Sequence, residues 1–557
     1  MAAGEHPLAR ALYGLCACLR RAPVLPRTSA DCAELLQALV TWAAPGSDKK
    51  VPDRAAAALR ASLLLLEAVS AESCGGRVTG AGTAQAEPIP NAEEAGKSVD
   101  SSLLLDTDVA PKGKSGPKLL EDGALSLEGD HVAPESTRKK GGAPTSEENL
   151  EPSSNNGGTP TSPNGAPNSD FGTVPGSPLA GHGSSSVLGP KCILRCATAP
   201  LLLLCGAHIK DAPWSDGESR HLANQLLRSI LKESDYTSVA ELLKGPEEQP
   251  YTTFKEALGM LGPRLRKDTW ESHPEAKLVF SWLLFQVPRP WLSEFLSMVM
   301  PPSLLFSDDY KTENKVLGVR CLHHIIRNVP AAELRQYNRA LVAYHALRNH
   351  LYTKDAEVIE VVLPCLVDLF PVLHKPAPVV GAFQKDGECP SDQVMQLVLT
   401  DMEMEHKIVL RRLYARNLPA LQERLGIRIA HHMKRLLRVI VGYLEVSDGP
   451  EESARLSILE TLQGTIKYAW PRIPPRLPLL LKALVKLLYE LSSESNQISA
   501  PVTEALLSGA TECLLLLDRC SKGQVKTALQ GIPLVCNEPL LLKCINRVTA
   551  SDSNGTK

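Results

Sequence analysis

The chain has 557 residues, more than the ~250–300 over which a single hydrophobic core usually extends, so its length predicts several units or a repeat array. Its 60 basic and 62 acidic residues give a formal net charge of −2, which excludes a general electrostatic attraction to nucleic acid or to an anionic membrane. Aromatic residues make up only 4%, whereas an all-β protein usually carries more of them. The 14 cysteines are scattered and form no CxxC pair, which fits a reducing compartment.

Residues 1–74 carry apolar side chains at helical spacing in three stretches separated by prolines, and therefore predict an N-terminal helical segment. Residues 75–190 are rich in Gly, Pro, Ser, Asn and Thr, and Phe171 is their one aromatic residue. Such a composition cannot bury enough apolar surface to offset the entropy of the chain. We predict a disordered low-complexity linker over 75–190 and a disordered tail over 550–557.

Residues 191–549 show apolar side chains in steps of three and four, typical of amphipathic helices, and no useful stretch alternates with the period of a strand. The helices recur in pairs at a spacing close to the ~40–47 residues of HEAT and armadillo repeats. Thr312 is placed to cap the first of these helices. We expect an all-α fold, a HEAT/armadillo-like α-solenoid of stacked helix pairs with a long disordered insertion near the N-terminus. The candidate first helices begin near Glu313, Asp355, Glu405, Glu451 and Val502.

Enzyme motifs are incomplete in this sequence. Two GKS segments, at 96–98 and 113–115, imitate a phosphate loop, but Asn91 and Asp108 stand where the motif requires glycine. No GxSxG elbow and no recognisable Cys–His arrangement is present. We therefore expect no catalytic residue.

Two kinds of paired residues also suggest chemistry at first sight. The adjacent histidines at 323–324 and 431–432 would point about 100° apart on a helix, so neither pair converges on one metal ion. The acidic pair at 308–309 suits acid–base chemistry or Mg²⁺, but a loop with a helix-capping role explains it better. We expect no metal and no cofactor.

Residues 407–438 form a basic segment in which Glu423 is the single acid. One interpretation is a docking face for an acidic patch of a partner protein; nucleic acid is less favoured because aromatic residues are too sparse to stack on bases. The other is a set of solvated helix faces. Trp291 is either an exposed interface anchor or, as we favour, packing at the junction of two repeats. The candidate partner-binding residues are Arg411, Arg412, Arg416, Arg428, Arg435, Arg438 and Trp291.

Several stretches resemble a known family, most closely over about 270–530. They are SDDYKTENKVLGVRCLHHII (307–326), NVPAAELRQYNRALVAYHALRNHLYT (328–353), RRLYARNLPALQERLGI (411–427), RVIVGYLEVSDGPEESARLSILETLQ (438–463) and LLLLDRCSKGQVK (514–526). They are similar to the Tel-two-interacting protein two family, whose members are the smallest subunits of the Triple T (TTT) co-chaperone complex.

The resemblance implies an all-helical, HEAT-like protein that joins two larger subunits, the Tel-two protein and its first interacting protein. It also implies that the assembled complex works with the ninety-kilodalton heat-shock chaperone and the R2TP complex. The clients would be phosphatidylinositol-3-kinase-related kinases such as mTOR, ATM, ATR, DNA-PK and SMG-type kinases, whose folding, assembly and stability affect DNA-damage checkpoints and growth signalling. The family is known for no catalytic residue, so none is carried over.

The expected function is therefore a non-enzymatic scaffold, and the alternative is a helical-repeat transport adaptor of the karyopherin type. The apolar run at 197–209 is shorter than the ~20 residues of a membrane span, and no secretory pattern is present at the N-terminus. We expect a cytoplasmic protein that has no membrane or nucleic-acid partner. The sequence neither supports nor excludes nuclear entry.

Overall fold

The computed structural model describes residues 51–75, 190–374, 389–493 and 498–550, which all belong to one compact unit of the chain. Every regular element in these ranges is an α-helix or a 3₁₀ helix, and no strand occurs among them, so the predicted all-α class is confirmed. The predicted linker and tail lie outside these ranges, except that residue 75 ends one helix, residue 190 begins the next and residue 550 ends the last. The first two predicted N-terminal helices also lie outside them.

The elements are named in chain order. The α-helices of the first half are α3 (Val51–Gly75), α4 (Pro190–His208), α5 (Gly217–Glu233), α6 (Val239–Lys244), α7 (Thr252–Leu261), α8 (Pro274–Leu284), α9 (Leu296–Ser307), α10 (Thr312–Asn328), α11 (Ala331–Arg335) and α12 (Arg339–His350). Those of the second half are α13 (Ala356–Leu373), α14 (Pro390–Met404), α15 (Ile408–Leu425), α16 (Met433–Leu444), α17 (Ser453–Ala469), α18 (Leu477–Ser492), α19 (Ala500–Cys520), α20 (Gln524–Leu529) and α21 (Pro539–Ala550). Short 3₁₀ helices are η1 (Gly262–Leu265), η2 (Trp270–Ser272), η3 (Trp291–Phe295), η4 (Gln336–Asn338), η5 (Gly426–His431), η6 (Trp470–Arg472), η7 (Pro474–Arg476) and η8 (Ile532–Leu534).

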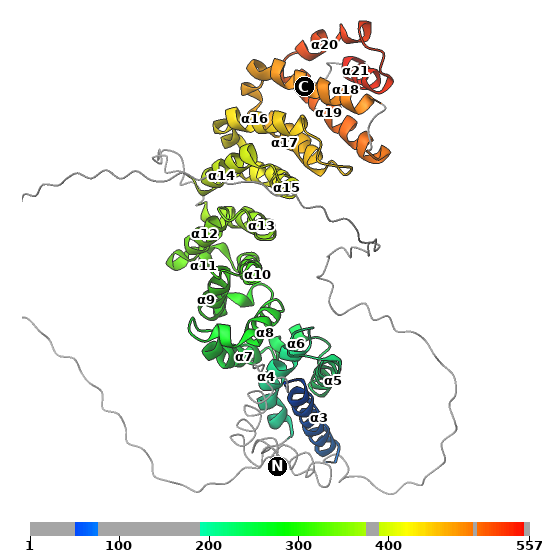
Figure 1. Cartoon of the computed structure of the whole chain (residues 1–557). Coiled ribbons are helices and arrows are strands. Elements are labelled where there is room, and N and C mark those ends of the chain that lie inside the picture. The colour runs from blue at the N-terminus through cyan, green and yellow to red at the C-terminus, as the bar shows by residue number, and fades with distance from the viewer. Residues whose placement is uncertain (1–50, 76–189, 375–388, 494–497, 551–557) are drawn as a thin grey trace, which may run out of the picture. The chain divides into compact units, whose positions relative to one another are not determined.

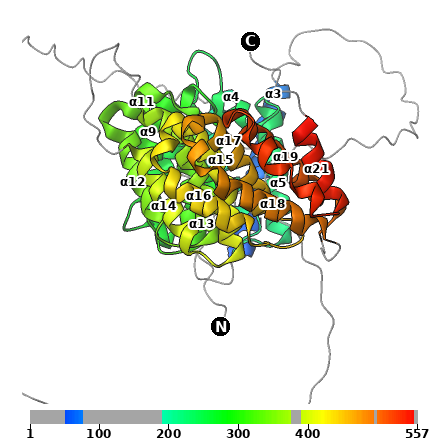
Figure 2. The same ribbon diagram turned by 90° about the horizontal axis from the view of Figure 1, so that it is seen from above.

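From α9 to α19 the helices alternate between two layers. In one layer α10, α13, α15, α17 and α19 each contact the next, and each also packs against its partner in the other layer, which is α9, α12, α14, α16 or α18. Figure 1 shows these pairs following one another in chain order, and Figure 2 shows them from above, where α13 to α18 overlap. The first-layer helices begin within three residues of the predicted starts, and the predicted stacking of HEAT-like pairs is confirmed.

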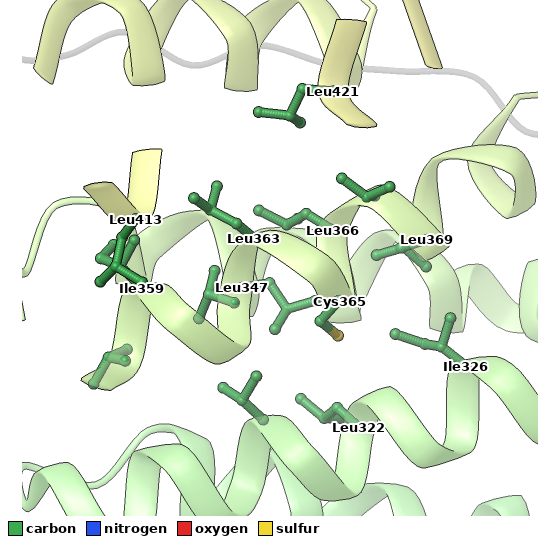
Figure 3. Packing of buried hydrophobic residues seen from close by; sticks show 14 of the residues in the cluster. Leu322, Ile326, Leu347, Ile359, Leu363, Cys365, Leu366, Leu369, Leu413 and Leu421 are labelled. Atoms are coloured by element: carbon green, nitrogen blue, oxygen red, sulfur yellow. The ribbon is translucent and has the colours of Figure 1, made fainter. Parts of the chain in front are cut away.

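Helix α13 shows why the pairs must stack. Its sequence AEVIEVVLPCLVDLFPVL is apolar on almost every side, and a helix of that kind is stable only when neighbours cover it all round. Figure 3 shows Leu322 and Ile326 of α10 on one side of α13 and Leu413 and Leu421 of α15 on the other. All four side chains are buried, and replacing one such leucine by alanine typically costs about 2–5 kcal/mol.

The closest approach of two helices in this region is at Gly318, in the middle of α10. A β-carbon at this position would lie 2.2 Å from the backbone nitrogen of Ser307 and 2.7 Å from the carbonyl carbon of Phe306. Both atoms belong to the last turn of α9, and backbone atoms cannot rotate away as a side chain can. Only glycine therefore allows α9 and α10 to pack at this distance.

The predicted role of Thr312 is wrong. Lys311 is the N-cap residue of α10 and makes no side-chain cap, and Thr312 is already the first helical residue. The Thr312 hydroxyl instead donates a 2.6 Å hydrogen bond to the carboxylate of Asp355. Asp355 is in turn the N-cap of α13, where it accepts from the backbone N–H of Glu357. The hydroxyl thus joins the starts of two successive first-layer helices.

Helix α3 contains the third predicted N-terminal stretch, and its residues Leu59, Leu63 and Leu66 are buried. It packs against α4 and α5. The segment 76–189 therefore joins two helices that contact each other, which is why a long insertion is compatible with a continuous core here.

Within the described ranges, α19 alone is long and apolar enough by composition to cross a membrane. Length and composition are weak evidence, because the core helix of a soluble protein passes the same test. Leu506, Cys513, Leu514 and Leu517 of α19 are fully buried, and the helix packs against α17, α18 and α21. These residues form the face of α19 that packs in the stack, and 39% of its apolar window is buried.

Candidate partner-binding surface

The basic segment 407–438 runs through α15, η5 and α16, and its arginines meet acids from other helices. Arg428 forms a close ion pair with Asp392 at the start of α14, and Nε2 of His432 lies 2.8 Å from the same carboxylate. Arg435 and Arg438 both reach Glu403 near the end of α14, at 2.9 and 3.1 Å. The two arginines hold the pKa of Glu403 below its usual range, the Arg435 hydrogen bond contributing most.

Other arginines of this segment contact α13. Arg416 lies 3.9 Å from Glu360, and Arg424 lies 3.8 Å from Asp368. The Asp368 carboxylate also lies 2.9 Å from Nε2 of His323 and 3.9 Å from Nε of Arg327, both on α10. Asp368 therefore gathers cationic side chains from the helices on both sides of α13.

The remaining two arginines are engaged at the start of α15. Nε of Arg412 donates a 2.9 Å hydrogen bond to Asp448, whose carboxylate also accepts from the backbone N–H of Ala454 in the first turn of α17. The Arg411 guanidinium lies 3.8 Å from the centroid of the Tyr443 ring, within the range of a cation–π interaction. Burial raises the pKa of Tyr443, so the ring carries no charge near neutral pH.

All six predicted arginines therefore have an anionic or aromatic partner within the stack. These contacts join successive helix pairs, although exposed pairs of this kind contribute only about 0–1 kcal/mol each. The segment 407–438 has an excess of basic residues in the sequence, but acidic residues of α13, α14 and the α16–α17 turn lie next to its arginines in the folded chain. Binding of a partner by these arginines stays a prediction, and Arg416 and Arg438, 66% and 60% exposed, are the most accessible for it.

Trp291 begins η3 and is half-buried. Its ring centroid lies 5.5 Å from that of Tyr251, which immediately precedes α7, and Tyr251 also contacts Phe295 at 6.4 Å. These ring contacts agree with the favoured interpretation, in which Trp291 packs at the junction of two helix pairs. A role of Trp291 in partner binding stays a prediction.

Most of the paired residues singled out in the sequence contact neighbouring elements, whereas Asp308 and His431 are exposed. His324 places Nε2 3.1 Å from the backbone carbonyl of Val287, and burial lowers its pKa. Asp309 accepts a 2.5 Å hydrogen bond from the Asn314 side chain, and Asp308 is the C-cap of α9. In the part of the chain that the structure describes, no three His, Cys, Asp or Glu residues are grouped so as to hold a metal ion.

One chemically suggestive pair was not predicted from the sequence. Nε2 of His374, at the end of α13, lies 2.8 Å from Sγ of Cys389, and Ser391 Oγ lies 3.2 Å from the same sulfur. A cysteine nucleophile needs an accessible thiolate, usually stabilised by a cation. Cys389 is only 8% exposed, and burial lowers the pKa of His374, so that ring is neutral near pH 7. The geometry favours a structural contact that joins α13 to α14.

The chain is similar in sequence to known proteins over much of its length. The model of the Tti2 family matches residues 201–451, which run from α4 to the turn before α17. Rattus norvegicus TELO2-interacting protein 2 is 49% identical over 359 residues, covering 64% of this chain and 70% of that protein. The Homo sapiens TELO2-interacting protein 2 is 49% identical over 369 residues, covering 65% of this chain and 72% of that protein.

Among solved structures, importin beta crystallised in an ammonium sulfate condition is 15% identical with a TM-score of 0.43, and the match covers 64% of this chain and 42% of that one. This likeness is weak. The resemblance seen in the sequence at 307–353 and 411–463 is confirmed by the matches to the two mammalian proteins. Because about half of the aligned residues are identical over some 70% of the rat protein, this chain belongs to the Tti2 family.

Proposed function

We propose that the chain is a non-catalytic scaffold subunit of the Triple T co-chaperone complex. The observation that carries the proposal is the 49% identity to proteins named for their interaction with TELO2, which covers 64–65% of this chain and 70–72% of those proteins. The chain would bind the Tel-two protein and its first interacting protein. A stack of helix pairs supplies an extended surface suited to such contacts.

Through that complex the chain would support the folding, assembly and stability of phosphatidylinositol-3-kinase-related kinases, together with the ninety-kilodalton heat-shock chaperone and R2TP. Binding by itself stabilises a partner by mass action, and no bond need be made or broken. A scaffold therefore requires no catalytic site. The buried face of α13 is apolar, and the six arginines described above contact acids or an aromatic ring of neighbouring elements. A cytoplasmic location is part of the same proposal.

The test is a replacement experiment in cells depleted of their own relative of this chain. The tagged chain is expressed at matched levels, and the two larger subunits and the kinases are quantified in the purified complex and in the lysate. We expect both subunits to co-purify at near-equal amounts and the kinase levels to be restored. Gly318→Ala, which forces α9 and α10 apart, is expected to restore less than Gly442→Ala, whose new methyl group meets no atom within 4 Å.

Recovery of neither subunit would overturn the scaffold proposal. Recovery of nuclear-pore and cargo proteins in their place would favour the transport-adaptor alternative. A scaffold also predicts that kinase levels follow the amount of chain in proportion. Full restoration by a small fraction of the normal amount would instead point to a catalytic role.

A further inference from the structure

The turn between α17 and α18, residues 467–476, differs from the rest of the basic surface. Its sequence KYAWPRIPPR forms the end of α17, then η6 and η7. Trp470 is 58% exposed, and Tyr468 beside it is 38% exposed. Single exposed apolar residues are ordinary on a protein surface, but a tryptophan this open is uncommon because its large ring is usually well buried. Trp470 therefore needs an explanation other than core packing.

Three cations surround this tryptophan in the sequence, namely Lys467, Arg472 and Arg476, and all are exposed. Within the described part of the chain none of the three is joined to a carboxylate, unlike the arginines of α15 and α16. Lys467 lies at the C-terminus of α17, where the helix dipole favours a cation. Arg472 and Arg476 precede the N-terminus of α18, where the helix dipole disfavours a cation. The first turn of α18 contains no acidic residue that could pair with them. Folding by itself therefore gives no reason for the two arginines.

The turn is also rigid. Pro471, Pro474 and Pro475 restrict its backbone, and Ile473 between them is fully buried and anchors it to the core. A surface that is already ordered loses little conformational entropy when a partner binds. Exposed Trp and Arg on a preorganised support are the residue types that dominate binding energy at protein interfaces.

The preceding turn of the stack also exposes an apolar residue, although its arginine is paired with Asp392. The 3₁₀ helix η5 contacts α17 and presents Ile427, 78% exposed, beside Arg428. At the opposite end of α17 the sign reverses, since Glu445, Asp448 and Glu451 lie in the turn before that helix. Unlike the cations of the α17–α18 turn, these acids are paired within the stack: Asp448 and Glu451 with Arg412, and Glu445 with Lys486.

We propose that the α17–α18 turn is a docking site for an acidic surface of a partner protein. Trp470 packs into an apolar recess of that partner, and Lys467, Arg472 and Arg476 meet its carboxylates. A protein fits better than a nucleic acid, because Tyr468 and Trp470 offer apolar area while the turn has only three cations to contact phosphates. This inference rests on the proposed function, which requires such a partner.

The test compares variants of the full chain for binding to the purified pair of larger subunits. The first variant is Trp470→Ala/Arg472→Glu/Arg476→Glu, and the second keeps the tryptophan and carries only the two charge reversals. The matched controls are Tyr489→Ala, an aromatic residue 53% exposed near the other end of α18, and Lys482→Glu/Lys543→Glu, which makes the same charge change at two other exposed sites. Circular dichroism melting verifies that each variant is folded.

We expect the first variant to lose at least about tenfold in affinity and the controls to change by less than about threefold. The affinity of the wild-type chain should fall more steeply between about 0.1 and 0.5 M salt than that of the charge-reversal variant. If the wild type binds and the folded first variant binds equally well, the docking site is overturned while the proposed function stands. If the wild type binds neither subunit, both are overturned. If the first variant lost binding to an RNA oligonucleotide but kept its binding to the subunits, the proposal that a protein occupies this site would likewise be overturned.

Discussion

The tight crossing of α9 and α10 makes Gly318→Ala the most informative single substitution. On an isolated helix this change would be favourable by about 0.8–1.0 kcal/mol, because alanine has the higher helix propensity. Here the new methyl group would lie 2.2 Å from the backbone nitrogen of Ser307. Real β-carbon contacts are essentially never closer than 3.0 Å, so the two helices must separate by the better part of an ångström.

The magnitude follows from these two opposing effects. Overpacking a buried site costs about 1–3 kcal/mol, and the upper end applies because the opposing atoms are backbone and cannot change rotamer. After the gain in helix propensity is subtracted, Gly318→Ala should destabilise the chain by about 2 kcal/mol. Gly442→Ala in α16 has open space around its new methyl group and should stabilise by about 0.5–1 kcal/mol.

The assay is urea unfolding of the purified full chain, followed by circular dichroism, with both variants measured beside the wild type. The two midpoints should move in opposite directions from that of the wild type. Because the chain is a repeat array, the midpoint of the main transition is compared rather than an extrapolated free energy. A Gly318→Ala variant as stable as the wild type would refute the close packing of α9 on α10.

Two further predictions concern the core and its histidines. Leu437→Asp introduces a charge at a position only 2% exposed and should lower the free energy of unfolding by more than about 3 kcal/mol. Leu479→Asp, at a position 42% exposed, is the control and should lower it little. Unchanged thermal melting of Leu437→Asp would show that this face of α16 is not part of the core. Burial lowers the pKa of three histidines below the value of about 6.5 expected in the unfolded chain. Their contribution to stability is therefore present above that pH and is lost as pH falls through the lower folded pKa values, so the urea midpoint should fall between about pH 7 and pH 5. Replacing one of them by glutamine should reduce this fall, and an equally steep fall in that variant would contradict the assignment. The three are His324, His350 and His374.

The place and the type of the helices could be predicted because they depend on local periodicity. The apolar stripe of α10 and that of α16 repeat within a few turns, and the distance between successive helix starts needs no knowledge of contacts. The lack of a recognisable catalytic motif could also be read along the chain. The same locality explains the error at Thr312, whose hydroxyl was assigned to its own helix although its acceptor, Asp355, begins the next first-layer helix.

The helical class, the order of the pairs and the family resemblance could therefore all be predicted from the amino-acid sequence. Which charges are neutralised depends on the packing of the helices, because the arginines of 407–438 pair with Asp368, Asp392 and Glu403 on other helices. The same packing makes Gly318 a crossing point and leaves Trp470 open to solvent. Ion pairing and exposure depend on distances between helices that are far apart in sequence, and stacking the pairs sets those distances.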